Sequence, residues 1–346
     1  MDDARLQGIF EEGEDAWIVG GAVRDLLLDR RVVDVDVACA DPRAAAYRFA
    51  KREGGAPFPL SERHGAWRVA AEGSDETVDF TPLPDGIEAD LATRDFTINA
   101  IAVPVGGGDA VDPHGGRADL AAGVLRAVAD TIFCDDPLRL LRAVRIEEEL
   151  GFRMDERTES LLRDAASLVT EPAGERILAE LRRVGPAGFR RLDEVGLLAP
   201  LGGSLEGPYE ALDLPEFRLV AVLGERLSRL PISNDLRRYT ATLLRARPPE
   251  DTSPRAIHRF RKATEPWALD ALAFVRASEL SELVEAARVA DPPEPLVRGD
   301  ELGLPPGPAI GRILARIDEE RAAGTISTRE QALALAHTIA CAEAAR

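Results

Sequence analysis

The chain has 346 residues, of which 45% are hydrophobic and 30% charged. Such a length and composition are typical of a soluble globular protein with two or more structural units. The sequence contains no apolar run near the roughly 20 residues that a membrane span needs, and its start does not resemble a secretory signal. We therefore expect a cytoplasmic protein with no membrane partner.

The net charge of -18 gives no general support for a nucleic-acid partner, because proteins that contact many phosphates are usually basic. A local basic surface is still compatible with such binding. Arginines are concentrated at 139–145, 182–191 and 237–247. Surface salt bridges are the alternative explanation for these arginines.

The cysteines and histidines argue against thiol and imidazole metal sites. Three widely spaced cysteines suggest neither a disulfide framework nor a CxxC site. The four histidines show no HExxH or HD pairing, which argues against a zinc hydrolase. We therefore expect any metal to be held by carboxylates.

Short β-type runs alternate with helical or glycine-rich segments in the first third of the chain. The runs lie at 16–20, 32–38, 66–71, 76–80 and 98–105. From about Asp135 onward, the apolar residues follow a helical period. The sequence thus predicts an α/β head with a mixed sheet, followed by an all-α neck, body and tail. Sequence breaks, most of them rich in proline and glycine, give these parts the expected bounds 1–130, 131–200, 201–290 and 291–346.

The predicted strand AWIV leads into Gly20 and Gly21, and Arg24 follows on the first turns of a helix. Glycines without a Cβ let backbone N–H groups approach a ligand closely, and the arrangement suits a triphosphate. A tight strand-to-helix turn with no ligand is the alternative.

Asp34 and Asp36 are two residues apart in an apolar run, so on a strand they share one face of the sheet. Two carboxylates on one face repel each other unless a cation lies between them, which suggests Mg²⁺. In two-metal phosphoryl transfer, one ion activates the attacking hydroxyl and the other neutralises the leaving pyrophosphate. A solvent-facing edge strand is the alternative.

Asp136, Arg139, Arg142 and Arg145 recur at every third position of a predicted helix, so neighbouring members lie close on one gradually rotating face. Aligned arginines repel each other unless they face an anion or are flanked by acids, as the acidic run at 147–149 would provide. Asp136 before a proline is also a good helix cap, and Asp135 is an alternative cap.

Three segments resemble the class II tRNA nucleotidyltransferase and poly(A) polymerase family: GGAVRDLLLDRRVVDVDVA, TRDFTINAIAV and DDPLRLLRAVRI. They occur in the order typical of that family, and the resemblance covers about residues 17–185. Near the end, PLVRGDELGLPPGPAIGRIL resembles the tail of the tRNA-acting members. Residues of about 200–290 carry nothing distinctive. The resemblance implies a nucleotidyltransferase head, a neck with a base-reading helix, a body and a tRNA-binding tail.

The function implied by this resemblance is template-independent addition of C and A to the 3′ end of tRNA, with release of pyrophosphate. Two Mg²⁺ ions are the implied cofactors, and CTP and ATP the implied substrates. The product is a full CCA end or its CC part. The alternatives are an enzyme that adds only A, a poly(A) polymerase, and a noncatalytic protein that binds RNA or nucleotides. The tail favours tRNA over poly(A).

The resemblance also implies roles for the matching residues. Gly20, Gly21 and Arg24 contact the triphosphate, and Asp34 and Asp36 hold Mg²⁺. The residues implied to touch the sugar and phosphates of the incoming nucleotide are Arg94, Asp95 and Asn99.

Further implied residues lie on a neighbouring strand and in the neck. Asp79 is a candidate third catalytic carboxylate, with an exposed strand acid as the alternative. Asp136 and Arg139 read the base, and the later arginines of the same helix are further nucleotide-binding candidates: Arg142 and Arg145. The residues implied to brace this helix are Glu175, Arg176 and Glu180.

The physical logic of base reading supports a preference for C and A. Both bases present an amino donor beside a ring-nitrogen acceptor, which a carboxylate and a guanidinium satisfy together. Guanine and uracil present a carbonyl and a ring N–H at those places, which would leave polar groups unpaired.

The sequence departs from the family pattern at three places. Fourteen residues separate Asp79 from Arg94, whereas members that add a full CCA usually carry a longer loop there. Thr93 replaces an arginine, and Asp135 stands where glutamate is common. The shortened loop resembles that of members that add only CC, and we expect efficient addition of CC and poor addition of the terminal A.

Overall fold

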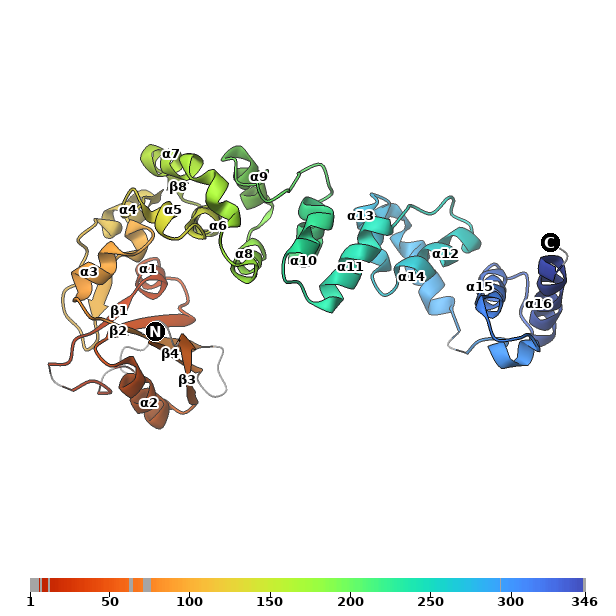
Figure 1. The fold of residues 1–346 in the computed structure, drawn as a ribbon, viewed down its shortest axis with the longest axis horizontal. Coiled ribbons are helices and arrows are strands. Elements are labelled where there is room, and N and C mark those ends of the chain that lie inside the picture. The colour runs from red at the N-terminus through yellow and green to blue at the C-terminus, as the bar shows by residue number, and fades with distance from the viewer. Residues whose placement is uncertain are drawn as a thin grey trace. The chain divides into compact units, whose positions relative to one another are not determined.

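The computed structural model describes residues 6, 8–11, 13–61, 65–70, 76–292 and 294–344. The chain forms two compact units, residues 1–201 and 202–346, which are coloured along the chain in Figure 1. The first unit contains a mixed sheet, and the second is helical, so the predicted fold class is confirmed. The finer division into four parts stays a prediction. Within the described part of the chain, no helix has the length and apolar character needed to cross a membrane.

The main sheet has six strands in the order β3-β4-β5-β2-β1-β6. Strands β2 and β5 are parallel, and all other neighbours are antiparallel. The strands are β1 (Ala16–Val19), β2 (Asp34–Cys39), β3 (Ala56–Ser61), β4 (Ala66–Ala70), β5 (Thr77–Pro82) and β6 (Ala102–Pro104). Central strand β2 therefore has β1 on one side and β5 on the other, which places the Asp34 and Asp36 segment in the middle of the sheet.

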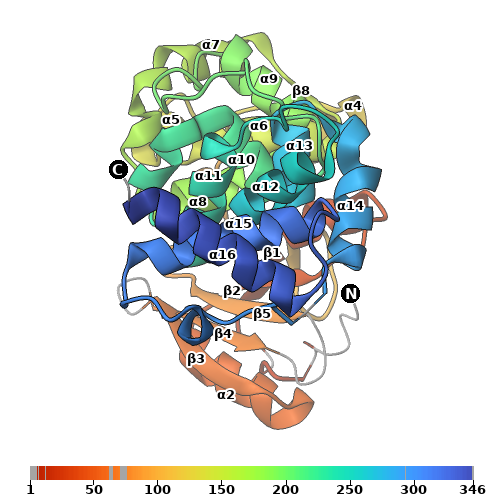
Figure 2. The ribbon, with the colours of Figure 1, turned by 90° about the vertical axis from the view of Figure 1, so that its right-hand side faces the viewer.

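Helix α2 (Pro42–Glu53) packs on one face of β3, β4 and β5, as Figures 1 and 2 both show. The ring of Phe49 lies 5.9 Å from that of Phe80, and Tyr47 lies 5.6 Å from Trp67. Because side chains alternate along a strand, residues next to Trp67 and Phe80 point to the opposite face.

Three short elements position the chain next to β1 and β2. They are α1 (Gly21–Leu27), α3 (Ile87–Ala92) and the 3₁₀ turn η2 (Thr97–Asn99). A buried cluster of Val19, Ala38, Leu91, Ala100 and Ala102 joins α3 and the end of η2 to the sheet, and α1 packs against β1, β2 and η2. This packing fixes the polar residues before and within η2, among them Arg94, Asp95 and Asn99.

The rest of the first unit is mainly helical. Helix α6 (Arg139–Leu150) buries Leu140, Leu141 and Val144, as its helical apolar period predicts. It packs against α8 (Gly174–Leu181) and α9 (Pro186–Glu194). The elements are α4 (Gly116–Ala122), β7 (Val124–Leu125), α5 (Ile132–Asp135), α6 (Arg139–Leu150), β8 (Arg153–Met154), α7 (Glu156–Asp164), η3 (Ala166–Thr170), α8 (Gly174–Leu181) and α9 (Pro186–Glu194).

The second unit is built from helices throughout its described residues. They are α10 (Pro215–Leu223), η4 (Gly224–Arg229), α11 (Asn234–Arg245), α12 (Pro254–Thr264), α13 (Ala268–Phe274), η5 (Ser278–Leu280), α14 (Ser281–Ala290), η6 (Gly299–Leu302), α15 (Pro308–Ala322) and α16 (Arg329–Ala344). Helix α12 packs on α14 and α15, and an apolar cluster that includes Val297, Ile313 and Ala332 joins α15 to α16.

Candidate active site

The turn between β1 and α1 depends on Gly20. Its φ of 72° lies in the left-handed region that favours glycine. A Cβ at this position would come within 2.8 Å of Arg94 Nη1 and 3.3 Å of Asp36 Oδ2. A side chain here would be strained and would have to displace the Arg94 guanidinium, so glycine lets the turn lie next to both charged groups.

Asp34 and Asp36 lie on the same face of β2, as predicted. Asp34 is exposed and accepts a hydrogen bond of 2.6 Å from Thr77 Oγ1. Burial raises the pKa of Asp36 above its ordinary value, and Asp79 and Asp34 raise it further, while Arg94 lowers it. A cation between the two carboxylates would relieve this repulsion, so the pair fits the Mg²⁺ that the sequence implies.

Asp79 lies directly beside Asp36 in the register of parallel strands β5 and β2. Both of its carboxylate oxygens accept hydrogen bonds from Arg68 on β4, at 2.6 Å and 2.7 Å. Among the described residues, no three histidine, cysteine or acidic side chains are grouped to hold a metal ion. Asp79 thus lies beside Asp36 but is engaged by a guanidinium, which leaves Asp34 and Asp36 as the candidate metal ligands among the described residues.

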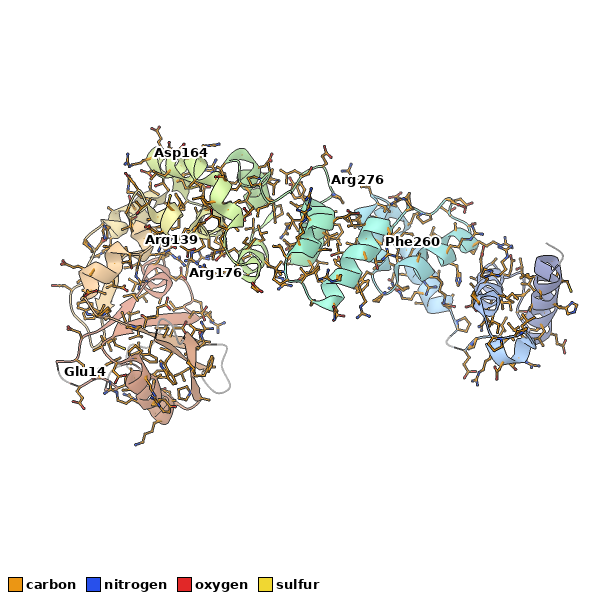
Figure 3. All side chains as sticks on the ribbon, viewed as in Figure 1. Glu14, Arg139, Asp164, Arg176, Phe260 and Arg276 are labelled. Atoms are coloured by element: carbon orange, nitrogen blue, oxygen red, sulfur yellow. The ribbon has the colours of Figure 1, made fainter. Side chains whose placement is uncertain are left out.

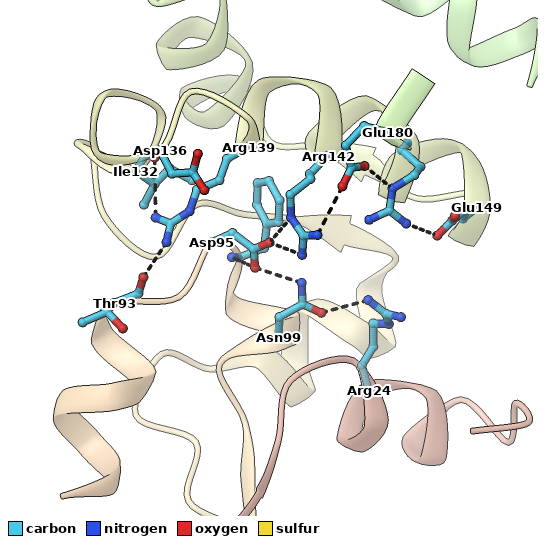
Figure 4. Close-up of polar contacts among 12 residues, drawn as sticks. Arg24, Thr93, Asp95, Asn99, Ile132, Asp136, Arg139, Arg142, Glu149 and Glu180 are labelled. Atoms are coloured by element: carbon cyan, nitrogen blue, oxygen red, sulfur yellow. Dashed lines mark hydrogen bonds and ion pairs between the residues drawn. The ribbon is translucent and has the colours of Figure 1, made fainter. Parts of the chain in front are cut away.

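A chain of hydrogen bonds leads from α1 to α6 (Figure 4). Arg24 Nη1 donates to Asn99 Oδ1 at 2.9 Å, and Asn99 Nδ2 donates to Asp95 Oδ1 at 2.9 Å. Arg142 completes the chain by donating from Nε and Nη2 to Asp95 Oδ2, at 3.1 Å and 2.9 Å. The predicted residues of three separate motifs are therefore joined in one network.

Asp95 is the centre of this network and is buried, with 7% of its surface exposed. Burial alone would raise the pKa of this carboxyl, but Arg142 and the hydrogen bonds from Asn99 and the Phe96 N–H hold it below its ordinary value. Asp95 is therefore charged near neutral pH and fixes Asn99 and Arg142 relative to each other.

Arg94 is held by α3. Its Nε and Nη2 donate to Asp90 Oδ2 at 2.9 Å and 2.8 Å. The pair spans one helical turn, the spacing at which side chains meet on a helix surface. The remaining Nη1 approaches the Gly20 turn, where Arg94 can meet a bound phosphate.

A cavity of about 330 Å³ opens beside this network, a size at the lower end of small-molecule sites. Figure 3 labels Arg139 and Arg176, both of which contribute to its wall. Its lining residues are Asp90, Thr93, Arg94, Asp95, Asp136, Leu138, Arg139, Arg142 and Arg176. Most of these side chains are charged, so the cavity suits a polar ligand.

The two predicted base-reading residues both line this cavity. Asp136 accepts hydrogen bonds from the Leu138 N–H at 3.2 Å and from Arg176 Nη2 at 2.8 Å. Arg139 Nη2 donates to the Thr93 carbonyl at 2.7 Å. Asp136 therefore acts partly as the cap considered from the sequence, and Arg176 braces it.

Asp135 and Arg145 do not reach the cavity. Asp135 accepts a hydrogen bond from Thr131 Oγ1 instead of capping α6. Arg145, which we expected to bind nucleotide, is 4% exposed and donates to Glu180 at 2.6 Å and to Glu149 at 2.7 Å. Its charge is used inside the neck, so we do not retain it as a nucleotide contact.

The braces predicted for α6 differ in their contacts. Glu180 accepts from both Arg142 and Arg145, at 3.5 Å and 2.6 Å, and so links α8 to α6. Arg176 reaches Asp136, while Glu175 is exposed.

Two residues at the site were not found from the sequence. Arg68 binds Asp79, and Asp90 holds Arg94. The second pair carries a readable signal, since an acid four residues before an arginine is a helical pairing. Arg68 has no local signal, because its partner lies on another strand.

Comparison with known proteins identifies the family. The family described as Poly A polymerase head domain matches residues 16–126. A CC-adding tRNA nucleotidyltransferase of Geobacter sulfurreducens is 47% identical over 178 residues, which cover 50% of this chain and 40% of that protein. An A-adding tRNA nucleotidyltransferase of Deinococcus radiodurans is 33% identical, over 92% of this chain and 94% of that protein. The chain belongs to the tRNA nucleotidyltransferase family.

The fold agrees with this tRNA nucleotidyltransferase assignment. The Thermotoga maritima CCA-adding enzyme complexed with tRNA matches with a TM-score of 0.72 at 23% identity, and the match covers 96% of this chain and 94% of that one. The matched head residues 16–126 include the Gly20 turn, the two carboxylates of β2 and the segment from Arg94 to Asn99.

Proposed function

We propose that the chain adds C nucleotides, and A with lower efficiency, to the 3′ end of a tRNA that lacks it. The observation that carries this proposal is the cavity lined by Asp136 and Arg139, which Arg142 and Asp95 connect to Arg24. One hydrogen-bond network thus connects this polar cavity, which is large enough for a base, to Arg24, which we assign to the triphosphate. Nucleotide transfer requires the base and the triphosphate to be held at fixed positions relative to each other. The similarity to CC-adding tRNA nucleotidyltransferases supports the same function.

Binding of the nucleotide follows from this geometry. Arg94 lies next to Gly20 and Asp36, and Arg24 lies next to Gly21, so we assign these two arginines and the Gly20 turn to the triphosphate. Asp34 and Asp36 would hold Mg²⁺, which, when bound, favours the deprotonated attacking hydroxyl and neutralises the leaving pyrophosphate. Asp95, charged and buried, keeps Asn99 in place during this binding.

The transfer itself makes one bond and breaks one. The 3′-hydroxyl oxygen of the RNA forms a bond to the α-phosphorus of the nucleotide, and its proton passes to solvent. The bond from this phosphorus to the oxygen that bridges to the β-phosphate breaks, and pyrophosphate leaves with that oxygen. The head residues contribute mainly by placing the reacting groups in line.

Selection of the base is assigned to Asp136 and Arg139. A carboxylate accepts from the amino group of cytosine or adenine, while a guanidinium donates to the neighbouring ring nitrogen. Arg139 is now bonded to the Thr93 carbonyl, and a base entering the cavity would take over one of its donors. Uracil and guanine would leave both protein groups unpaired.

The test uses purified full-length protein, Mg²⁺ and a tRNA without its 3′ CCA. Each labelled NTP is supplied alone, and labelled ATP is also supplied together with unlabelled CTP. We expect incorporation from CTP and, after two additions, from ATP, with none from UTP or GTP. Asp36→Ala should abolish addition while RNA binding is kept, because the carboxylate acts on transfer more than on docking. Wild-type rates in that variant would exclude the metal assignment.

A second candidate function is addition of the terminal A alone. It is favoured by one of the relatives that match nearly the whole chain, an A-adding enzyme, whereas a CC-adding enzyme that matches 96% of the chain favours the first proposal. In the same assay, this function predicts incorporation from ATP on a tRNA ending in CC and none from CTP on the shorter tRNA.

A further inference from the structure

Four residues form a row across neighbouring strands on the face of the sheet away from α2. The register pairs Phe58 on β3 with Arg68 on β4, Arg68 with Asp79 on β5, and Asp79 with Asp36 on β2. Directly paired residues lie on the same face of a sheet. The row therefore runs from the edge strand to the catalytic carboxylate.

The outer half of this row is accessible. Phe58 is 44% exposed, and the side chain of Arg68 is 33% exposed. Arg68 uses Nε and Nη2 to bind Asp79. A guanidinium carries five N–H donors, so the Nη1 group of Arg68 is still able to bind a further anion.

The order of the strands indicates what this anion is. The Gly20 turn, which we assign to the triphosphate, follows β1 on one side of β2, whereas β5, β4 and β3 lie on the other side. In phosphoryl transfer, the attacking and leaving oxygens are roughly in line across the phosphorus. If pyrophosphate leaves toward β1, the attacking 3′-hydroxyl arrives over β5, β4 and β3.

We propose that Arg68 and Phe58 bind the last nucleotide of the RNA that is being extended. Arg68 contacts a backbone phosphate of this nucleotide, and the Phe58 ring stacks on its base. Asp79 orients Arg68 through their two hydrogen bonds and acts as a positioning residue. This inference rests on the proposed function, and it adds the site for the second substrate.

The two residues suit a single-stranded 3′ end. An aromatic face stacks on any base, and the accepting end changes from the discriminator base to C during successive additions. Stacking on Phe58 and a phosphate contact with Arg68 do not depend on the identity of the last base, so they can hold the RNA end at every addition. Selection of the incoming base is assigned to Asp136 and Arg139.

The first experiment separates stacking from other effects of Phe58. The full-length protein adds C to a tRNA ending at the discriminator base, and KM is measured for RNA and for CTP. Phe58→Ala and Phe58→Leu should lower kcat/KM for RNA about 5- to 100-fold, the scale of one base–aromatic stack, with KM for CTP changed less than about twofold. Phe58→Tyr should restore the wild-type value.

The matched control is Tyr47→Ala, which removes an exposed aromatic from α2 on the other face of the sheet. It should leave kcat/KM for RNA unchanged. An equal loss in Tyr47→Ala and Phe58→Ala, or wild-type activity in Phe58→Leu, would overturn the stacking role. A wild-type protein that extends no RNA would instead refute the proposed function.

A second experiment tests the phosphate contact of Arg68. The dissociation constant for the same tRNA is measured at several salt concentrations, with wild type, Arg68→Lys and Arg68→Ala. Loss of one phosphate contact should reduce the slope of log K against log salt by about 0.7 in Arg68→Ala, whereas the lysine variant should keep it. An unchanged slope together with a lower kcat would show that Arg68 only neutralises Asp79.

Discussion

Arg139 differs from the other arginines of α6 because its guanidinium donates to backbone carbonyl oxygens, those of Thr93 and Ile132. Arg142 and Arg145 are bonded to carboxylates instead. The Arg139 guanidinium has no carboxylate partner among the described residues, so it can exchange its present hydrogen bonds for those of a ligand more easily than Arg142 or Arg145. Its position in the cavity wall agrees with this role.

We therefore predict that Arg139→Ala loses base discrimination. Without the guanidinium, the ring nitrogen of C or A is no longer recognised, and the preference over U and G should fall by about 1–3 kcal/mol, the scale of one bidentate contact. Competition assays with labelled NTP pairs measure this ratio. Arg157→Ala, an exposed arginine paired with Asp130, is the control, and an unchanged ratio in Arg139→Ala would make Arg139 a phosphate or packing residue.

Asp95 gives a prediction for pH. Its pKa is lowered in the folded protein, so its ion pair stabilises the fold fully above the unfolded pKa of about 3.9. This contribution is lost as the pH falls toward the lowered folded value. In urea unfolding, Asp95→Asn should cost about 1–3 kcal/mol at pH 7 and should show a weaker loss of stability below about pH 4 than wild type. Parallel pH curves for the two proteins would contradict this.

The residues of the site could be predicted from the sequence where local spacing determines them. Asp34 and Asp36 share a face because side chains alternate on a strand. The same kind of spacing explains why Arg145 does not reach the cavity, although we expected it to bind nucleotide. Three residues turn an α-helix by about 300°, which is about 60° short of a full turn. After two such steps, Arg145 lies about 120° around α6 from Arg139. One faces the cavity, and the other faces the neck interior.

At the scale of elements, α9 begins at a cap supplied by another helix. Glu148 accepts hydrogen bonds from the Gly185 N–H at 2.7 Å and the Gly188 N–H at 2.8 Å. A Cβ on Gly188 would overlap Glu148 and approach Val184 Cγ1 to 2.6 Å. Val184 is buried, and the Glu148 carboxylate is held by its two hydrogen bonds. Neither side chain can easily move away, so a glycine at position 188 is needed for α9 to approach Glu148 this closely.

We predict that Gly188→Ala destabilises the protein by about 1–3 kcal/mol, the usual cost of overpacking. Gly311 provides a matched control, because it lies inside α15 and a Cβ added there would have no atom within 4 Å. Gly311→Ala should stabilise its helix by about 1 kcal/mol. Urea unfolding of both variants measures the difference, and equal stabilities would contradict the packing argument.

Strand β3 shows why some elements could not be predicted. Its sequence APFPLS contains two prolines, which read as a loop because proline removes a ladder donor. The strand lies at the edge of the sheet, where such a residue is tolerated. The edge position depends on the complete sheet order, and no local pattern carries that information.

The segment between β5 and α3 is shorter than the sequence suggested. Strand β5 ends at Pro82 and α3 begins at Ile87, so residues 83–86 alone connect them. The helix then holds Arg94 through Asp90. A loop that closes over one base and reopens for a larger one needs length and hinge residues, and this connection has little of either.

We therefore predict that CC is added efficiently and the terminal A poorly. With CTP and ATP together, a tRNA ending at the discriminator base should accumulate CC ends. The terminal step should be at least about tenfold slower, equivalent to about 1.4 kcal/mol in its barrier. Sequencing of the 3′ ends over time measures this, a tRNA ending in CC with ATP alone serves as the control, and prompt CCA ends would refute it.

At the scale of the whole molecule, the net charge of -18 has to be reconciled with RNA binding. The second unit contains exposed arginines with no carboxylate partner among the residues that the structure describes. Among them are Arg226, Arg229, Arg237, Arg245 and Arg247. Arg245 and Arg247 line a cavity of about 530 Å³ with Arg259, so positive charge is locally available although the chain is acidic overall.

We predict from this distribution that residues 1–201, expressed alone, bind CTP as the full chain does but bind tRNA more weakly. The first unit contains its own core and every residue assigned to the nucleotide, so its CTP affinity should be kept. Each lost arginine–phosphate contact reduces the slope of log K against log salt by about 0.7–0.9, and loss of two or more should make the slope visibly shallower. Circular dichroism establishes that the fragment is folded, and the dissociation constants for CTP and tRNA are then measured against salt. An unchanged tRNA affinity and slope would place the whole RNA site in the first unit, whereas lost CTP binding in a folded fragment would contradict the nucleotide assignment.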